Sequence, residues 1–207
     1  MDEALSHLKS ADPVMTRLIA QYSRPTFTKH ANYYQELVSG IIGQQLSLAA
    51  ARAIETRFRA LFGGNFPAPE EILTIDVETL RGVGFSRPKA RYVQDLALKI
   101  LDGSVSFIGL DDQSNEEIIT QLTHVKGIGE WTVHMFLIFC MARQDVLPVG
   151  DLGIRNGITK LYGLEHQAMP GDVAEVAEQQ NWRPYESVAS WYIWQSLENA
   201  PTTTASS

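Results

Sequence analysis

Apolar residues recur every three or four positions along most of the chain, which is the spacing of one face of an α-helix. The segments "VMTRLIAQY" after Pro13 and "LAAARAIETRFRALF" after Ser47 both follow this pattern. Segments in which apolar and polar residues alternate, as in a half-buried β-strand, do not recur in the sequence. The pattern therefore predicts an all-α fold with nine to eleven helices.

Residues that satisfy unpaired backbone groups mark where these helices begin. A side chain with a free oxygen precedes the apolar repeat at five places, and Pro13 follows the first of them at the favoured first helical position. Glu117 completes a capping box with the last. The predicted N-caps are Asp12, Ser47, Asp76, Ser86 and Ser114.

The composition predicts a soluble protein that folds by itself. A length of 207 residues with 44% apolar content is sufficient for a buried core. The apolar run at 135–141 falls far short of the roughly 20 residues that cross a bilayer. The first residues, "MDEALSHLKSADP", are acidic and polar, whereas a secretory signal begins basic and then apolar. We therefore expect a cytoplasmic location and no membrane contact, and the single Cys140 agrees because it can form no internal disulfide.

The charge of the chain is unevenly distributed. A formal net charge of -7 argues against a nucleic-acid partner, because phosphate contacts need Lys and Arg. However, residues 78–99 contain five basic and two acidic side chains, whereas residues 164–184 contain four acidic and one basic. This distribution is compatible with a basic face on an acidic protein, and equally with a solvated helix of mixed charge.

Two glycines one residue apart, Gly127 and Gly129, separate the end of one predicted helix from the start of the next. Without a Cβ the turn can be tight, and a ligand can approach its backbone N–H groups. The following helix start adds unpaired donors and a positive dipole end, so a DNA phosphate fits here without any reading of base sequence. An ordinary helical hairpin that ends in a glycine cap explains the two glycines equally well.

Asp151 follows Gly129 by 22 residues. That distance leaves room for a helix from about Glu130 to Met141, a loop through Pro148, and an Asp at the head of the next helix. The common role of such an Asp is to cap "LGIRNGITKLYG". A carboxylate also stabilises the positive charge that develops on a sugar when a glycosidic bond breaks, and one residue can serve in both ways.

Five segments carry a resemblance to a known family, and they occur in the order that the family uses. They are "IIGQQLSLAAARAI", "LRGVGFSRPKARYVQDLA", "LTHVKGIGEWTVHMFL", "VLPVGDLGIRNGI" and "NWRPYESVASWYIW". Over residues 34–194 the chain resembles the helix-hairpin-helix DNA glycosylases, and within them the alkylated-base (3-methyladenine) DNA glycosylase II group.

The resemblance implies a two-lobed helical DNA glycosylase fold over residues 1–198. We expect a middle lobe at about 45–150 that contains the helix-hairpin-helix motif at 115–142. The N-terminal and C-terminal helices would form the other lobe, and the N-terminal sheet domain of larger family members would be missing. Residues 199–207 have the composition of a disordered tail.

The resemblance also implies a reaction, with Asp151 at the family's catalytic aspartate. The expected enzyme is a monofunctional glycosylase that flips alkylated purines out of DNA and hydrolyses the N-glycosidic bond, which leaves an abasic site. Relatives that also cut the strand use a Lys nucleophile where this chain has Trp131. No lyase activity is therefore expected. Whether Asp151 stabilises charge or orients the attacking water stays open.

The resemblance places the base pocket on Trp131, Met135 and Trp194, with Trp194 as the aromatic on which the extruded base stacks. An aromatic face suits a cationic alkylated purine. The side chain that fills the gap in the duplex corresponds to Gln45, with Gln44 beside it. Two glutamines at a helix end that bond to a loop backbone are the structural alternative.

Further side chains are expected to contact double-stranded DNA that contains alkylated bases. Lys126 replaces the family's usual Pro, and Glu186 replaces a residue that is often Arg. The expected DNA contacts are Gln44, Gln45, Arg87, Lys89, Lys126, Gly127, Gly129 and Thr132.

No cofactor is expected to be required, although the family's hairpin can hold Na⁺ or K⁺ through backbone carbonyls. In this chain those carbonyls belong to Thr123, Val125 and Ile128. An iron–sulfur cluster is excluded, because it needs four thiolates and the chain has one Cys. The protein is expected to act as a monomer, associated with the nucleoid if it is bacterial.

Two alternatives were weighed against this interpretation. The first is a glycosylase for deaminated or oxidised bases. The second is a non-catalytic helix-hairpin-helix DNA-binding module, which explains Gly127 and Gly129 but leaves Asp151, Trp131 and Trp194 without a role.

Overall fold

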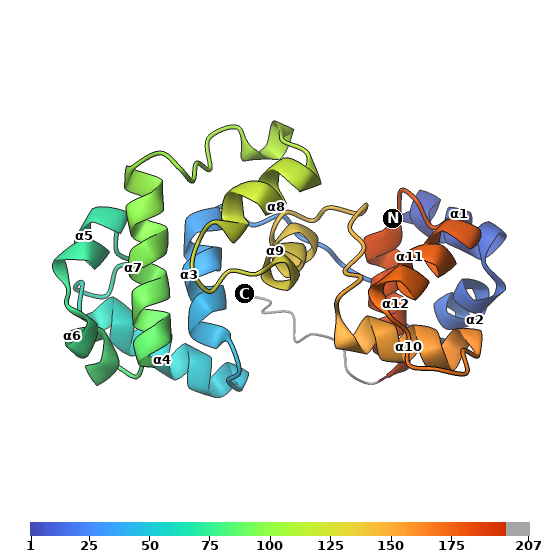
Figure 1. Cartoon of the computed structure of the whole chain (residues 1–207), viewed down its shortest axis with the longest axis horizontal. Helices are drawn as coiled ribbons and strands as arrows, with labels where there is room; N and C mark the ends of the chain where they lie inside the picture. Colours follow the sequence, from blue (N-terminus) through green and yellow to red (C-terminus); the bar gives the residue numbers. More distant parts are fainter. Residues whose placement is uncertain (198–207) are drawn as a thin grey trace. The chain divides into compact units, whose positions relative to one another are not determined.

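The computed structural model describes residues 1–197, in which it contains twelve α-helices and no β-strand (Figure 1). The all-α prediction is confirmed. The predicted number of helices, nine to eleven, was too low. The helix α5 (Pro69–Thr74) was not predicted, because its six residues are too few to show an apolar repeat and its N-cap, Ala68, has no side-chain oxygen. The tail predicted at 199–207 lies outside the described residues.

Contacts between residues divide the chain into two compact units. Within the described residues, unit 1 combines Met1–Lys29 with residues 137–197, and unit 2 is His30–Phe136. The sequence predicts a middle lobe at about 45–150, whereas unit 2 spans His30–Phe136. No helix within residues 1–197 is long and apolar enough to cross a membrane.

Unit 2 is built around α7 (Arg87–Leu101), which contacts α3, α5 and α6 (Figure 1). Its core includes Ile41, Phe58 and Leu96, all fully buried. Its other helices are α3 (Tyr33–Gly43), α4 (Leu48–Ala60), α5, α6 (Val77–Gly82), α8 (Asn115–Thr123) and α9 (Glu130–Met135), with a short 3₁₀ turn, η1, at Leu110–Asp112.

The predicted N-caps of unit 2 are confirmed by hydrogen bonds. The hydroxyl of Ser47 accepts from the Ala50 amide at 3.3 Å, and the carboxylate of Asp76 accepts from the Thr79 amide at 2.8 Å. Ser86 caps α7 in the same way. Ser114 and Glu117 form the predicted reciprocal capping box at the start of α8. Each bond satisfies a backbone donor that the helix itself leaves unpaired.

Unit 1 is organised around α12 (Glu186–Ser196), which packs against α1, α2 and α10. Asp12, the confirmed N-cap of α2, is fully buried and accepts bonds from the Val14 amide, the Tyr162 hydroxyl and the Trp182 indole. Three donors offset the cost of burying this carboxylate. The helices of unit 1 are α1 (Asp2–Ala11), α2 (Pro13–Gln21), α10 (Leu152–Tyr162), α11 (Pro170–Gln179) and α12.

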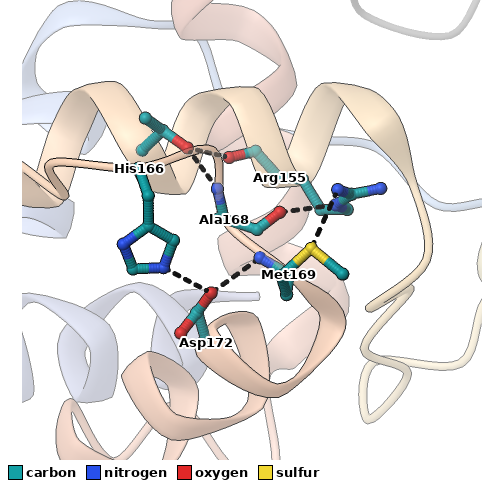
Figure 2. Close-up of polar contacts among 6 residues, drawn as sticks. Arg155, His166, Ala168, Met169 and Asp172 are labelled. Carbon is teal, nitrogen blue, oxygen red and sulfur yellow. Dashed lines mark hydrogen bonds and ion pairs between the residues drawn. The ribbon is translucent and has the colours of Figure 1, made fainter.

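The connection between α10 and α11 is fixed by side chains from both helices (Figure 2). The Arg155 guanidinium donates to the Ala168 carbonyl at 2.6 Å. Asp172 accepts from the Met169 amide at 2.7 Å and pairs with His166 at 3.1 Å, which caps the start of α11. The start of α11 is therefore tied to the second turn of α10.

The helix predicted from about Glu130 to Met141 has two parts. The α-helix α9 ends at Met135, and a π-helical segment, η2, covers Phe136–Cys140. Such a turn carries i→i+5 hydrogen bonds and widens the helix locally. The five residues are all apolar or Cys, so no spacing in the sequence distinguishes them from a regular helix.

Candidate functional site

Asp151 occupies the N-cap of α10 in unit 1, as its position in the sequence predicted. Its Oδ1 accepts hydrogen bonds from the Ile154 amide and from the indole Nε1 of Trp194, both at 2.8 Å. One donor comes from α10 itself and the other from α12, 43 residues further along the chain. The two donors fix the direction in which the carboxylate points.

Trp194 is 2% exposed, and it lies with its indole N–H against Asp151. The ring of Phe139 packs beside it, with 5.8 Å between ring centroids. Asp151 and Trp194, predicted as two parts of one site, are in direct contact. The indole N–H of Trp194 orients the carboxylate, whereas a ring that is 2% exposed offers almost no face to a base, so base stacking on Trp194 stays a prediction.

Gly153 is a residue of this site that sequence reasoning missed. A Cβ at position 153 would lie 3.0 Å from Asp151 Oδ1 and 3.1 Å from the Trp194 ring. Both distances are tighter than ordinary van der Waals contact, so a side chain here would press on the oxygen and on its indole donor together. The available signal was a glycine in the first turn of a helix, where it costs stability relative to Ala.

The loop before Asp151 is anchored by Ser187 in the first turn of α12. Ser187 is fully buried; its Oγ accepts from the Val146 amide at 3.1 Å, and its amide donates to the Gln144 carbonyl at 2.9 Å. Sequence reasoning missed this residue, whose only signal was a polar side chain in an apolar helix. The preceding residue, Glu186, is 6% exposed and accepts from Arg183 at 3.0 Å. This pair involves Oε1 alone, and the buried Oε2 of Glu186 has no hydrogen-bond partner within residues 1–197.

The glycine hairpin lies in unit 2, between the end of α8 and the start of α9. Gly127 has a φ of +81°, and a Cβ there would lie 2.1 Å from a ring carbon of Tyr92. Both facts require glycine. Gly129, the N-cap of α9, has a φ of -92° and no atom within 4 Å of such a Cβ. The two glycines therefore have different reasons to be there: Gly127 is needed for packing, whereas Gly129 leaves open space beside the backbone.

Asp95 contacts both the backbone amide and the side-chain ammonium of Lys126, and the sequence did not reveal this contact. The Lys126 amide donates to Asp95 Oδ2 at 2.8 Å, and its ammonium lies 3.5 Å from Oδ1. The side chain remains 75% exposed. Since this amide is occupied, the hairpin amides that donate to no acceptor within residues 1–197 are those of Gly127 and Gly129.

The two glutamines have different environments. Gln44 donates through Nε2 to the Gly127 carbonyl at 2.9 Å, which matches the structural alternative of a glutamine bonded to a loop backbone. Gln45 is exposed and has a φ of +57°, so it forms the tip of the corner between α3 and α4. Of the two, Gln45 is the side chain available to enter a DNA duplex.

Lys89 and Arg87, both predicted DNA contacts, already have partners in unit 2. The Lys89 ammonium donates to the carbonyls of Ile42 and Gln44 at 2.8 and 2.5 Å, where it caps the end of α3. Burial lowers the pKa of this ammonium. A DNA phosphate would have to compete with these carbonyls. Arg87 pairs with Glu78 at 2.6 Å on the surface, where such pairs contribute little.

The remaining predicted residues of unit 2 lie on or near the hairpin. Trp131 is 49% exposed in the first turn of α9, whereas Thr132 and Met135 are half-buried. The Val125 carbonyl accepts from the Ile128 amide at 3.1 Å and retains a second lone pair, as a cation ligand requires. The predicted base pocket is divided, since Trp131 and Met135 belong to unit 2 and Trp194 belongs to unit 1.

Comparisons with known proteins agree on one family. Residues 38–184 match the family model described as HhH-GPD superfamily base excision DNA repair protein. DNA-3-methyladenine glycosylase 1 of Schizosaccharomyces pombe is 36% identical over 191 residues, which cover 91% of this chain and 83% of the relative. The matched range of the family model includes both the glycine hairpin and Asp151.

Two solved structures extend this similarity to the fold. S. pombe 3-methyladenine DNA glycosylase (Mag1), in complex with abasic DNA, has a TM-score of 0.79 at 36% identity, with 95% of this chain and 97% of that chain covered. DNA-3-methyladenine glycosidase from Bacillus halodurans has a TM-score of 0.83 at 33% identity, with 93% and 88% covered.

Proposed function

Because the chain belongs to the HhH-GPD superfamily of base excision DNA repair proteins, we propose that it is a monofunctional DNA glycosylase for alkylated purines. It hydrolyses the N-glycosidic bond of bases such as 3-methyladenine in double-stranded DNA and leaves an abasic site. The observation that carries this proposal is the Asp151 carboxylate, which the Ile154 amide and the Trp194 indole hold by one oxygen. The similarity to 3-methyladenine glycosylases supports the choice of substrate.

Asp151 acts on the sugar. As the bond to the base breaks, positive charge develops on the deoxyribose, and a carboxylate already held in position stabilises it without reorganising. An alkylated purine carries positive charge and is a good leaving group, so one carboxylate suffices with little need for a strong general acid. Asp151 can also orient the water that attacks the sugar.

The hairpin of unit 2 holds the DNA backbone. The amides of Gly127 and Gly129 donate to a phosphate, a contact that reads no sequence. Extrusion of a base costs a few kcal/mol and is easiest for a damaged base. Gln45, exposed at the tip between α3 and α4, fills the vacated space. Trp131 and Met135 contact the base, and Trp131 gains a cation–π contribution of about 0.5–2 kcal/mol with a cationic purine.

The absence of strand cleavage follows from Trp131. A lyase requires an amine at this position to form a Schiff base with the sugar, and an indole cannot do so. Borohydride reduction during the reaction therefore traps no covalent complex between protein and DNA. A trapped complex would contradict the monofunctional assignment.

Three further features belong to the proposal. The carbonyls of Thr123, Val125 and Ile128 provide oxygen ligands for a Na⁺ or K⁺ ion that would stiffen the hairpin. Binding titrations with duplex DNA in matched sodium, potassium and tetramethylammonium buffers test this through the dependence of DNA affinity on the cation. The protein acts as a monomer. Its location is the cytoplasm, at the nucleoid if the cell is bacterial.

The decisive experiment measures release of bases from duplexes that contain 3-methyladenine, 7-methylguanine, uracil or 8-oxoguanine. Asp151→Asn keeps an oxygen for both donors but removes the charge, so we expect at least about a hundredfold loss in rate. Asp76→Asn is the matched control, because Asp76 also caps a helix through an amide at 2.8 Å. Asn caps helices as well as Asp does, so this variant should keep its activity.

Each outcome of this experiment discriminates between the alternatives. DNA binding without release of any base by the wild type would support a non-catalytic binding module. Preferential release of uracil or 8-oxoguanine would support a glycosylase for deaminated or oxidised bases. A loss below tenfold for Asp151→Asn would overturn the assignment of Asp151 as the catalytic residue.

A further inference from the structure

A hollow of about 730 Å³ lies on the surface of unit 2, away from Asp151 in the sequence and in a different unit. Residues of α5, α7 and the hairpin line it, and those that carry the argument are Leu73, Arg87, Arg91, Tyr92, Leu98 and Lys126. Pockets of this volume accept a drug-sized ligand or a few side chains of a peptide. Arg87 and Lys126 are also predicted DNA contacts, whereas Arg91, Leu73 and Leu98 have no role in the proposed base excision.

The walls of the hollow are preformed. α5 and α7 pack closely along their lengths, and Gln94 donates through Nε2 to the Ile75 carbonyl at 2.7 Å, which ties α7 to the end of α5. Tyr92 lies against Gly127 of the hairpin. The backbone of the hollow is therefore in place before a ligand enters, and the ordering cost falls on exposed side chains such as Arg91.

The charge of the lining is opposite to that of the whole chain. Arg87, Arg91 and Lys126 are cationic, and Asp95 is the single acidic residue among those that line the hollow. Asp95 binds the Lys126 amide and ammonium, and Glu78 pairs with Arg87. Within residues 1–197, Arg91 forms no ion pair and is exposed. On a protein of net charge -7, this grouping favours an acidic ligand.

The hollow also presents apolar surface. Leu73 on α5 is 39% exposed and Leu98 on α7 is 52% exposed. A single exposed leucine needs no explanation; here two exposed leucines share one hollow with three cationic side chains. A DNA backbone supplies charge but few apolar groups to cover leucine side chains. An acidic peptide with an apolar side chain satisfies both properties.

We propose that this hollow binds an acidic peptide segment of a partner protein, with an apolar side chain between Leu73 and Leu98 and a carboxylate on Arg91. Charge complementarity selects the segment and speeds its encounter, and the leucine contacts hold it. The proposal does not rest on base excision. A glycosylase that docks in this way would reach other proteins through unit 2.

The test is fluorescence anisotropy of a fluorescein-labelled peptide in which two leucines are flanked by glutamates. Arg91→Glu should weaken binding at least about tenfold, because it places two like charges opposite each other. Leu98→Ser should weaken it about threefold to tenfold through lost apolar contact. The matched controls are Arg52→Glu, exposed on α4, and Leu101→Ser, 44% exposed at the end of α7 but outside the hollow.

Circular dichroism and base release should both be unchanged in these variants, which would show that they fold and that peptide binding is separate from the reaction. Failure of the wild type to bind the peptide overturns the proposal, as does equal binding of a peptide whose leucines are replaced by serines. Displacement by undamaged duplex DNA, with an equal loss of DNA affinity in Arg91→Glu, would instead make the hollow part of the DNA surface. Concentration-dependent self-association that Arg91→Glu abolishes would make the occupant a second copy of the chain.

Discussion

The carboxylate of unit 1 and the hairpin of unit 2 are held by different kinds of interaction. Asp151 is fixed by hydrogen bonds to its own oxygen, one from the backbone of α10 and one from the Trp194 side chain. The hairpin is fixed by shape, since Gly127 packs its bare Cα against the Tyr92 ring. The Asp151 carboxylate has to point at a sugar that becomes positively charged, and directional hydrogen-bond donors fix that direction. A phosphate site needs backbone N–H groups that no side chain covers.

This difference predicts how each region fails. Variants that change the shape of the hairpin should lower both the stability of the protein and its affinity for DNA. Variants that disturb the Asp151 carboxylate should lower the rate of base release and leave the affinity for DNA unchanged. Each of the following variants is paired with a control: the same type of residue is substituted at a position where the effect should be absent.

The largest effect on stability is expected for Gly127→Ala. The new methyl group would overlap the Tyr92 ring and demand a left-handed backbone, so we expect a loss of about 2–4 kcal/mol in the free energy of unfolding. Chemical denaturation measures this loss, and DNA affinity should fall with it. Gly129→Ala meets no atom within 4 Å and should lose well under half as much. Equal losses for the two glycines would mean that shape does not hold the hairpin.

Trp194→Phe should lower the rate of base release about tenfold to a hundredfold, because a hydrogen bond to a charged group contributes about 1.5–3 kcal/mol. Single-turnover kinetics with saturating enzyme isolates this step, and the dissociation constant for undamaged DNA should be unchanged. Trp182→Phe removes the corresponding indole bond to Asp12 and should lower stability only. If both variants lose rate alike, Trp194 acts through the fold of unit 1 and not through Asp151.

Gly153→Ala should lower the same rate by about threefold to tenfold, with the protein still folded. The added methyl group would press on Asp151 Oδ1 and on the Trp194 ring, and so would turn the carboxylate. Gly150→Ala, where a Cβ meets nothing within 4 Å, is the control. An unchanged rate in Gly153→Ala would show that the orientation of the carboxylate is not limiting.

The smallest effect is expected for Gln44→Ala, which removes the bond to the Gly127 carbonyl. A loss of about 1 kcal/mol corresponds to a decrease of about 2–4 °C in Tm. Gln45→Ala should leave Tm unchanged and instead weaken binding to DNA with an extruded base. A shared decrease in Tm would indicate that Gln45, too, is structural.

Local signals in the sequence predicted much of the fold. Each predicted N-cap, from Asp12 to Ser114, depends on a residue and its neighbours within one turn, and all are present in the structure. The short α5 and the π-helical segment η2 were missed for a physical reason. The six residues of α5 show no apolar repeat and, unlike the equally short α6, follow no capping side chain, because the N-cap is Ala68. The segment "FLIFC" has no polar position from which a period could be measured.

The candidate site was less accessible to sequence reasoning, because its contacts join distant segments. The resemblance brought Asp151 and Trp194 to attention, but the hydrogen bond between them depends on how α10 and α12 pack. Lys89 and Arg87 were expected to contact DNA as basic residues of a segment that resembles the family. In the structure the Lys89 ammonium donates to carbonyls at the end of α3. The net charge of a segment therefore does not identify the partner of each side chain.

Lys89 and Gln44 together join two parts of unit 2 that face the DNA in our proposal. The Lys89 ammonium donates to carbonyls at the end of α3. The Gln44 side chain donates to the Gly127 carbonyl of the hairpin. The tip that carries Gln45 and the turn that binds a phosphate in our proposal are therefore linked by hydrogen bonds within one unit. The spacing between the side chain that enters the duplex and the phosphate contact would then be set by unit 2 alone, independently of the unit that carries Asp151.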